Sequence, residues 1–149
     1  MINTRAGSVA EKPAFRMAFR QRRRLVLADG FYEWRNSGGK KQPYYLGLKD
    51  GKPFAFAGLW ESWTAPDGEI IESCTIITTE ANAAVEQVHS RMPVILDPKD
   101  HQRWLDPSTD PEELKTLLRP NPADAMVLYP VSTHNSPRNE DPNCVPPLE

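Results

Sequence analysis

Short apolar runs separated by turn-forming residues dominate the chain, and few of them have the period of a helix. The stretch RLVLADGFYEWR (24–35) predicts a buried strand, a tight turn at Asp29-Gly30 and a second extended segment. A second Asp-Gly pair, at residues 50–51, predicts a hairpin turn, and NSGGKKQP (36–43) predicts a longer hairpin loop. Further strands are predicted at residues 43–49, 52–63, 72–81, 92–96 and 125–132.

Helical periodicity is confined to four segments. Residues 8–23 predict a helix start and body: Ser8 is a capping residue, Glu11 follows three positions later, and Phe15 and Phe19 share one face. Pro13 then belongs near the first turn, so the regular helix can begin there. Shorter helices are predicted at residues 81–88, 98–105 and 111–118. Many strands with a few short peripheral helices predict an α+β fold, in which a curled, largely antiparallel, barrel-like β-sheet surrounds its core.

The composition is that of a single domain of ordinary polarity. With 149 residues the chain can bury a real core, so residues 1–149 are interpreted as one domain. No apolar run approaches the ~18 residues of a membrane span, and no signal-peptide pattern is present. Cys74 and Cys144 define no disulfide framework, and the histidines match no zinc spacing. We therefore expect a cytoplasmic protein with neither a metal nor a cofactor.

The charges are distributed unevenly along the chain. The net charge is −2, yet residues 1–41 contain ten Lys or Arg against three acids, a balance of +7 that leaves −9 for the remainder. The densest basic run is FRMAFRQRRR (15–24). A basic face on an otherwise acidic protein attracts a polyanion such as nucleic acid. A solvated helix face accounts for the same charges.

Glu33 lies between Tyr32 and Trp34 in the segment ADGFYEW. In a strand these two neighbours point to the opposite face, so the carboxylate shares its face with Phe31 and Arg35. A carboxylate held among aromatic rings can have a raised pKa and act as a general acid or base. The alternative is a glutamate at the rim of the sheet that pairs with Arg35.

Two pairs of residues at i, i+2 spacing could meet an anionic ligand. His89 precedes Arg91 at the start of a predicted strand, and histidine titrates near neutrality while a guanidinium can hold a phosphate by two hydrogen bonds. Asn3 and Arg5 share one face if their segment is extended. Together with Glu33, these groups suit a phosphodiester-linked sugar better than a zinc ion. Each pair alone is equally compatible with a surface loop.

The order of these segments resembles the SRAP family, the SOS-response-associated peptidases. The resemblance rests on INTRAGSVAEKPAFR, LVLADGFYEWR, KKQPYY, VHSRMPVIL, and PVS followed by NSPRN, and covers essentially all 149 residues. It implies a DNA damage response protein that acts on abasic sites in single-stranded DNA. It also implies that Asn3 positions the reacting end, Glu33 shuttles protons and His89 assists opening of the sugar ring. Arg5 and Arg91 would hold the phosphates.

The chain departs from that family at its start. Family members carry a cysteine directly after the initiator methionine, whose α-amine and thiol form a thiazolidine with the ring-opened sugar aldehyde. This chain starts with Met1-Ile2 on the INTR motif, so we expect a domain that is N-terminally truncated relative to the family and lacks this nucleophile. Neither Cys74 nor Cys144 can replace it, because the thiazolidine needs an amine and a thiol on one terminal residue.

Two classes of function therefore stay open. In the first, Glu33 and His89 serve abasic-site crosslinking, lyase or peptidase (hydrolase) chemistry, with the α-amine of Met1 as nucleophile for a transient Schiff base. In the second, the chain is a truncated, non-catalytic single-stranded DNA-binding module. Only the family resemblance disfavours a small ribonucleotide-binding protein. Apolar surface left uncovered around Trp60 or Trp63 leads us to expect a monomer or a weak homodimer.

Overall fold

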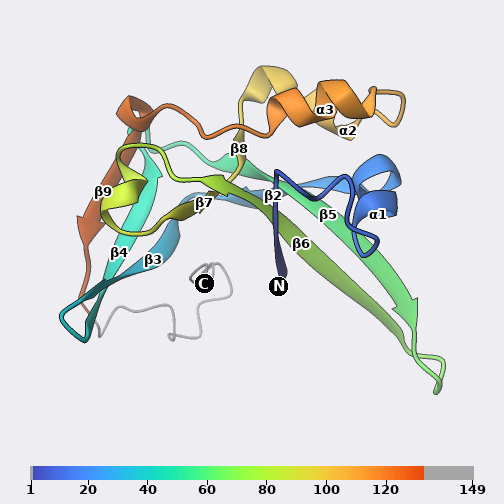
Figure 1. The fold of residues 1–149 in the computed structure, drawn as a ribbon, viewed down its shortest axis with the longest axis horizontal. Helices are drawn as coiled ribbons and strands as arrows, with labels where there is room; N and C mark the ends of the chain where they lie inside the picture. Colours follow the sequence, from blue (N-terminus) through green and yellow to red (C-terminus); the bar gives the residue numbers. More distant parts are fainter. Residues whose placement is uncertain (1, 133–149) are drawn as a thin grey trace.

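The strands form two sheets in the computed structural model, which describes residues 2–132 (Figure 1). The larger sheet places β1 (Ile2–Arg5), β6 (Ile70–Glu80), β5 (Phe54–Thr64) and β2 (Arg23–Ala28) side by side. Two short strands, β7 (Arg91–Pro93) and β8 (Ile95–Leu96), pair with β6 and β5. The smaller sheet consists of β3 (Phe31–Ser37), β4 (Lys40–Leu48) and β9 (Met126–Pro130). β1 runs parallel to β6, and the other pairs are antiparallel.

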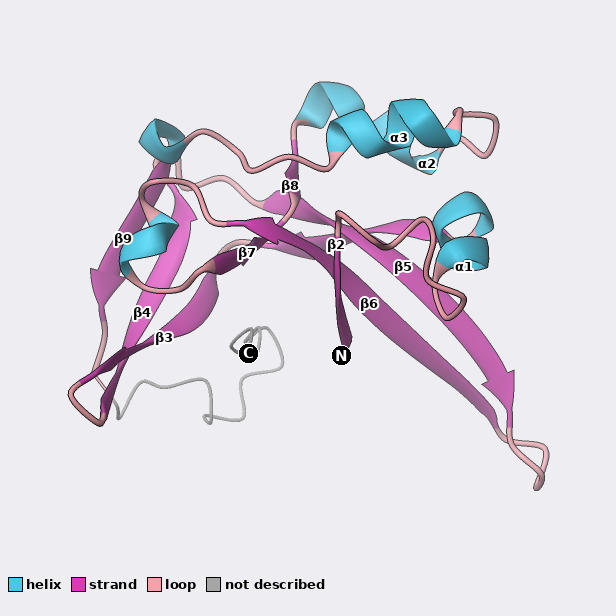
Figure 2. Ribbon diagram, in the orientation of Figure 1, coloured by secondary structure: helices cyan, strands magenta, loops and turns pink. Residues whose placement is uncertain are grey.

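Short helices lie along the larger sheet and between strands. α1 (Arg16–Gln21) lies beside β5, while α2 (His101–Leu105) and α3 (Pro111–Leu117) lie together at one side of the sheet (Figure 2). Three single-turn helices, η1 (Val85–Gln87), η2 (Pro98–Asp100) and η3 (Ala123–Ala125), lie in the connections. The predicted α+β class, with a curled, largely antiparallel sheet and few short helices, is confirmed. Within residues 2–132, none of the helices has the length and apolarity to cross a membrane.

The helix predicted at residues 8–23 is correct only in its second half. Residues 6–11 form turns, α1 begins at Arg16, and Arg23 already belongs to β2. The reason is Pro13, which has no backbone N–H to donate to the carbonyl four positions earlier, so a continuous helix cannot pass through it. The helix predicted at 81–88 is reduced to η1, and the Asn82 side chain before it accepts from the backbone N–H groups of Ala84 and Val85.

The long hairpin loop predicted at residues 36–43 is wrong. β3 and β4 stay paired as far as Ser37 and Lys40, and only Gly38 and Gly39 form the turn. Their φ angles of 58° and 81° lie in the left-handed region, which glycine enters without a Cβ penalty. The two glycines therefore extend both strands of the smaller sheet.

Gly30 allows the chain to pass from β2 into β3 against the ring of Tyr45. A Cβ at position 30 would overlap that ring, whose hydroxyl donates to the Asp29 carbonyl at 2.9 Å. We expect Gly30→Ala to lower the free energy of unfolding by about 1–3 kcal/mol, the usual cost of overpacking. Urea unfolding measures this change. Gly7→Ala is the control, since a Cβ there meets nothing within 4 Å. Equal stability of the two variants would contradict the prediction.

Two hydrophobic cores hold the elements together. The first, the helix-side core, packs Val9, Phe19 and the helices α2 and α3 on one face of the larger sheet; its buried members include Leu59, Ile77, Val94, Trp104 and Leu114. The second, the inter-sheet core, lies between the two sheets and includes Phe31, Leu46, Phe54, Phe56, Ile76, Met92 and Met126. Because successive strand residues point to opposite faces, β6 contributes Ile77 to one core and Ile76 to the other.

A buried guanidinium joins α1, α2 and β2. Arg23 is 9% exposed and donates to four backbone carbonyls at 2.5–2.8 Å, those of Phe19, Arg20, Trp104 and Asp106. Burial lowers the pKa of Arg23, and the nearby charge of Asp106 partly offsets this. Arg23 therefore ties the helices to the sheet.

The hairpin of β5 and β6 extends beyond its neighbouring strands. β2 pairs with β5 only as far as Leu59, so the last residues of the hairpin form a two-stranded ribbon. Trp63 and Ile71 are register partners on it and are 58% and 43% exposed. Apolar surface is thus present at Trp63, whereas Trp60 is half-buried. Association through this ribbon stays a prediction.

Candidate nucleic-acid interface

Three of the predicted site residues, Asn3, Arg5 and Arg91, lie on strands that pair with β6, and His89 lies just before β7. β1 places Asn3 beside Ile76 and Arg5 beside Thr78, and β7 places Arg91 beside Glu80. Asn3, Arg5, His89 and Arg91 line one pocket of about 330 Å³, together with Thr4, Thr78 and Ser90. Four of the five predicted site residues are therefore brought together, although more than eighty positions separate Asn3 from His89 in the sequence.

Arg91 is held in place by β6. Its Nη2 donates to the Thr78 carbonyl at 2.9 Å and lies 3.2 Å from the Thr78 hydroxyl, whereas Nε is buried and has no partner within residues 2–132. Burial lowers the pKa of Arg91, and the positive charge of Arg5 lowers it further, while Glu80 acts in the opposite direction. Two guanidiniums kept this close repel each other, and a bound anion relieves that repulsion.

His89 is fixed through one ring nitrogen. Its backbone N–H donates at 2.9 Å to the carbonyl of Val85, the first residue of η1. Its Nδ1 accepts from the Arg91 backbone N–H at 3.1 Å. Nδ1 is also 3.1 Å from the Arg91 carbonyl. In the tautomer with its proton on Nδ1, the ring donates to that carbonyl; in the other tautomer, Nδ1 accepts from the Arg91 N–H. In either case Nδ1 is occupied by the backbone, and Nε2 is the nitrogen left to exchange a proton with a ligand.

Glu33 lies on the other sheet and does not line this pocket. The side chain is 2% exposed, and its Oε1 accepts from the Trp34 backbone N–H at 3.3 Å. The interpretation as a rim glutamate is therefore wrong. On β3, Glu33 shares its face with Phe31, which packs in the inter-sheet core against the face of β6 that carries Ile76. Since Ile76 is the register partner of Asn3, the Glu33 and Asn3 side chains point towards the same layer.

The predicted basic run does not form one face. Arg16 and Arg20 are exposed on α1, Arg22 forms an ion pair with Glu61 at 2.7 Å, and Arg23 is buried. The run divides because β2 begins at Arg23, after which successive side chains point to opposite faces. The sequence could not show this division, because it depends on where α1 ends.

Thr78 is a site residue that the sequence did not indicate. It supplies both acceptors that hold Arg91, and its hydroxyl donates to the Thr4 carbonyl at 3.3 Å, which joins β1 to the same anchor. Nothing in the run TIITTE distinguishes Thr78 from the threonines beside it. The distinction appears only when β1 and β7 are both paired with β6.

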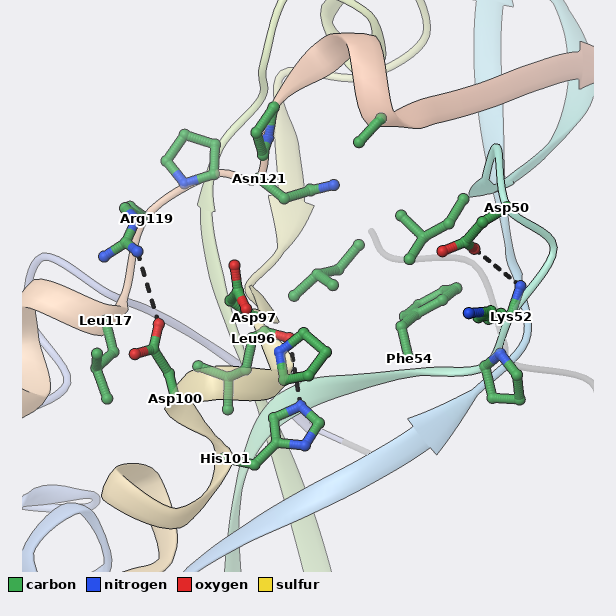
Figure 3. A pocket seen from close by; sticks show the side chains of 17 residues that line it. Asp50, Lys52, Phe54, Leu96, Asp97, Asp100, His101, Leu117, Arg119 and Asn121 are labelled. Atoms are coloured by element: carbon green, nitrogen blue, oxygen red, sulfur yellow. Dashed lines mark hydrogen bonds and ion pairs between the residues drawn. The ribbon is translucent and has the colours of Figure 1, made fainter.

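A separate cavity of about 330 Å³ lies near α2 and the segment after α3 (Figure 3). Its lining is mostly apolar, with Phe54 and Leu96 among its walls. The nearby charged group Asp100 is engaged by Arg119 at 3.6 Å and by Arg103 at 3.3 Å. None of the five predicted site residues lines this cavity. The pocket at β1 and β7 therefore remains the candidate site.

The part of the chain that the structure describes holds no cluster of metal-ligating side chains. No group of three or more His, Cys, Asp or Glu side chains that could hold a metal ion occurs among residues 2–132. What the arrangement offers instead is an imidazole beside two cationic groups at the edge of a curled sheet. Guanidinium groups suit the oxygens of a phosphate, and an imidazole suits proton transfer.

The chain belongs to the SRAP family. The family described as SOS response associated peptidase (SRAP) matches residues 1–136, which confirms the resemblance drawn from the sequence motifs. The abasic site processing protein YoqW of Bacillus subtilis (strain 168) is 46% identical over 148 residues, covering 97% of this chain and 66% of the relative. The abasic site processing protein HMCES of Gallus gallus is 35% identical over 170 residues, covering 99% of this chain and 50% of the relative.

Solved structures show the same fold. A protein from Bacteroides thetaiotaomicron superposes with a TM-score of 0.87 at 35% identity, covering 95% of this chain and 62% of that chain. A protein from Bordetella bronchiseptica gives a TM-score of 0.79 at 30% identity, covering 87% and 64%. The chain thus spans between half and two thirds of the length of these curated relatives and solved chains.

Proposed function

We propose that this chain binds single-stranded DNA at abasic sites and processes the exposed sugar, with Asn3, Arg5, Glu33, His89 and Arg91 as its site. The observation that carries the proposal is the pocket in which an amide, an imidazole and two mutually repelling guanidiniums meet. The relatives named abasic site processing proteins support the same substrate. The proposal places the protein in the cytoplasm, on DNA, as a monomer or weak homodimer without a metal or cofactor.

An abasic nucleotide fits the chemistry of this pocket better than an intact one. Its flanking phosphates can be neutralised by Arg5 and Arg91, and its sugar can face Nε2 of His89. Among residues 2–132, those that line the pocket include no Phe, Tyr or Trp on which a base could stack. The pocket therefore offers charge and proton transfer at the position where an abasic nucleotide has no base.

Glu33 is the second acid–base group in this proposal. An imidazole and a carboxylate that act at one sugar can remove one proton and donate another. Glu33 points towards the inter-sheet layer, the layer that the Asn3 face of β1 also meets. Asn3 is then the group that positions the reacting end of the sugar.

Replacing both Arg5 and Arg91 with alanine is expected to lower the affinity for an oligonucleotide with a central abasic site by about 100-fold or more. Each charge-assisted contact contributes roughly 1.5–3 kcal/mol. The slope of log affinity against log salt should also fall by roughly 1.4, since two phosphate contacts are lost. Fluorescence anisotropy over a salt series measures both quantities.

The matched control is Arg16→Ala combined with Arg20→Ala, which removes the same charge from the exposed face of α1. This variant is expected to bind nearly as the unchanged chain does. If both double variants lose affinity equally, general charge rather than the pocket governs binding. If neither loses affinity, the assignment of Arg5 and Arg91 is wrong.

A further inference from the structure

A row of residues crosses the larger sheet from the candidate site to β2. Asn3 on β1 is the register partner of Ile76, Ile76 of Gly58, and Gly58 of Arg24. Register partners point to the same face of a sheet, so Asn3 and Arg24 lie on one face. Three strand spacings of about 4.8 Å place them roughly 14 Å apart.

Gly58 makes room for Arg24 to lie across β5. A Cβ on this glycine would come within 2.7 Å of Val26 Cγ2 and 3.3 Å of Arg24 Cγ. The Arg24 guanidinium lies 5.7 Å from the centre of the Trp60 ring, two residues further along the same face of β5. Both side chains are half-exposed. The sheet therefore presents a planar cation backed by an aromatic ring.

The charge of Arg24 is not neutralised within the described part of the chain. Its neighbour Arg22 forms an ion pair with Glu61, but none of the ion pairs among residues 2–132 includes Arg24. The planar group of an arginine can stack with a nucleobase and still meet a phosphate at its edge. Arg24 and Trp60 thus offer what the pocket at Asn3 lacks, namely a surface for a base.

On the side of Arg91 away from Arg24, the charges of the protein disfavour binding of a DNA strand. The neighbouring pocket there is lined by Glu11 and Glu80 as well as by Arg91 and Lys115. The Lys115 ammonium lies 3.3 Å from a Glu11 carboxylate oxygen and 3.1 Å from a Glu112 oxygen. A DNA phosphate in that pocket would face carboxylates, whereas along the row towards Arg24 it would meet an uncompensated cation.

We propose that the DNA strand held at Arg5 and Arg91 continues across β6 and β5 to a second subsite, where an intact nucleotide beyond the immediate neighbour of the abasic site stacks on the Arg24–Trp60 pair. This inference rests on the proposed function and adds the path of the strand. It assigns Arg24 to binding of an intact nucleotide that lies beyond the immediate neighbours of the abasic one. The abasic sugar itself stays at Asn3 and His89.

Binding to two lengths of DNA tests the second subsite. A trinucleotide with a central abasic site is too short to reach Arg24, whereas an oligonucleotide of about twelve nucleotides spans the row. We expect Arg24→Ala to weaken binding of the longer DNA about tenfold and to leave the trinucleotide unaffected. Arg24→Lys, which keeps the charge without the planar group, should recover only part of the loss. Arg20→Ala is the matched control on α1.

The outcomes separate this inference from the proposed function. If Arg24→Ala binds the longer DNA as tightly as the unchanged chain while the Arg5/Arg91 double variant loses affinity, the second subsite is wrong and the proposed function stands. If Arg24→Ala weakens both DNAs equally, its effect is long-range charge and the subsite is again wrong. If the unchanged chain binds neither DNA, the proposed function fails and the subsite with it.

Cys74 provides a second readout that leaves Arg24 intact. It is the register partner of Trp60, and the pKa of its thiol is raised by burial and drawn the other way by Arg24. With Cys144 replaced by serine, a maleimide reports on Cys74 alone. We expect the longer DNA to slow this labelling several-fold and the trinucleotide to leave it unchanged. Equal labelling rates with and without the longer DNA would place the strand elsewhere.

Discussion

Replacing Arg23 with methionine is expected to lower the free energy of unfolding by roughly 3–5 kcal/mol, the cost of breaking a buried charged network. The Arg23 guanidinium donates to four carbonyls, of Phe19, Arg20, Trp104 and Asp106. Methionine retains much of the apolar stem but donates nothing, so those acceptors lose their charged donor, and a buried acceptor left without a partner costs about 1–3 kcal/mol. α1 and α2 would lose their common attachment to β2.

Urea unfolding followed by circular dichroism measures the change. Arg20→Met is the matched control, because Arg20 is exposed on α1 and undergoes the same chemical change. The control should stay within about 0.5 kcal/mol of the unchanged chain. A loss below about 1 kcal/mol for Arg23→Met would show that water or neighbouring groups replace the guanidinium, and that it is not the attachment inferred from its contacts.

Glu33→Gln is expected to slow abasic-sugar chemistry by on the order of 100-fold while leaving DNA affinity unchanged. Ring opening breaks the bond between the anomeric carbon and the ring oxygen, removes the hydroxyl proton and delivers a proton to the ring oxygen. Glutamine has the shape of glutamate but cannot carry the proton. Because Glu33 is 2% exposed, bulk water does not readily replace it.

The readout uses free cysteine as an added nucleophile, which supplies both amine and thiol to the opened aldehyde. Mass spectrometry then follows thiazolidine formation on abasic DNA with and without the protein. Glu86→Gln, at an exposed position of η1, is the matched control. A rate unchanged by Glu33→Gln would remove Glu33 from the chemistry. If the unchanged chain binds the DNA without accelerating the reaction, it is the non-catalytic binding module.

Much of the fold could be predicted from local patterns. The strands that became β5, β6 and β9 follow from alternation and turn residues, whereas the turn predicted at Asp29-Gly30 is a bend between strands of different sheets. The apolar spacing alone did not give the start of α1 at Arg16, because Pro13 interrupts the regular hydrogen bonding before it. The hairpin loop at 36–43 was wrong because the left-handed turn at Gly38 and Gly39 needs no further residues.

The site could be predicted as a set of residues but not as a geometry. Asn3, Arg5, His89 and Arg91 stood out by residue type and family motif, and they share a pocket. Their common anchor, Thr78, carried no signal, since its role comes from strands paired across the sheet. The burial of Glu33 depends on how the smaller sheet packs on the larger one, which no local period encodes.

The pairing of β1 with β6 also fixes when the site can exist during biosynthesis. Asn3 leaves the ribosome more than seventy residues before its register partner Ile76, and His89 and Arg91 follow later still. Contacts between such distant parts of a chain form late, because closing the intervening loop costs entropy before the contacts themselves stabilise the chain. The nascent chain therefore carries Arg5 apart from Arg91 until β7 has been synthesised. The pocket is complete only once β1 has docked on β6.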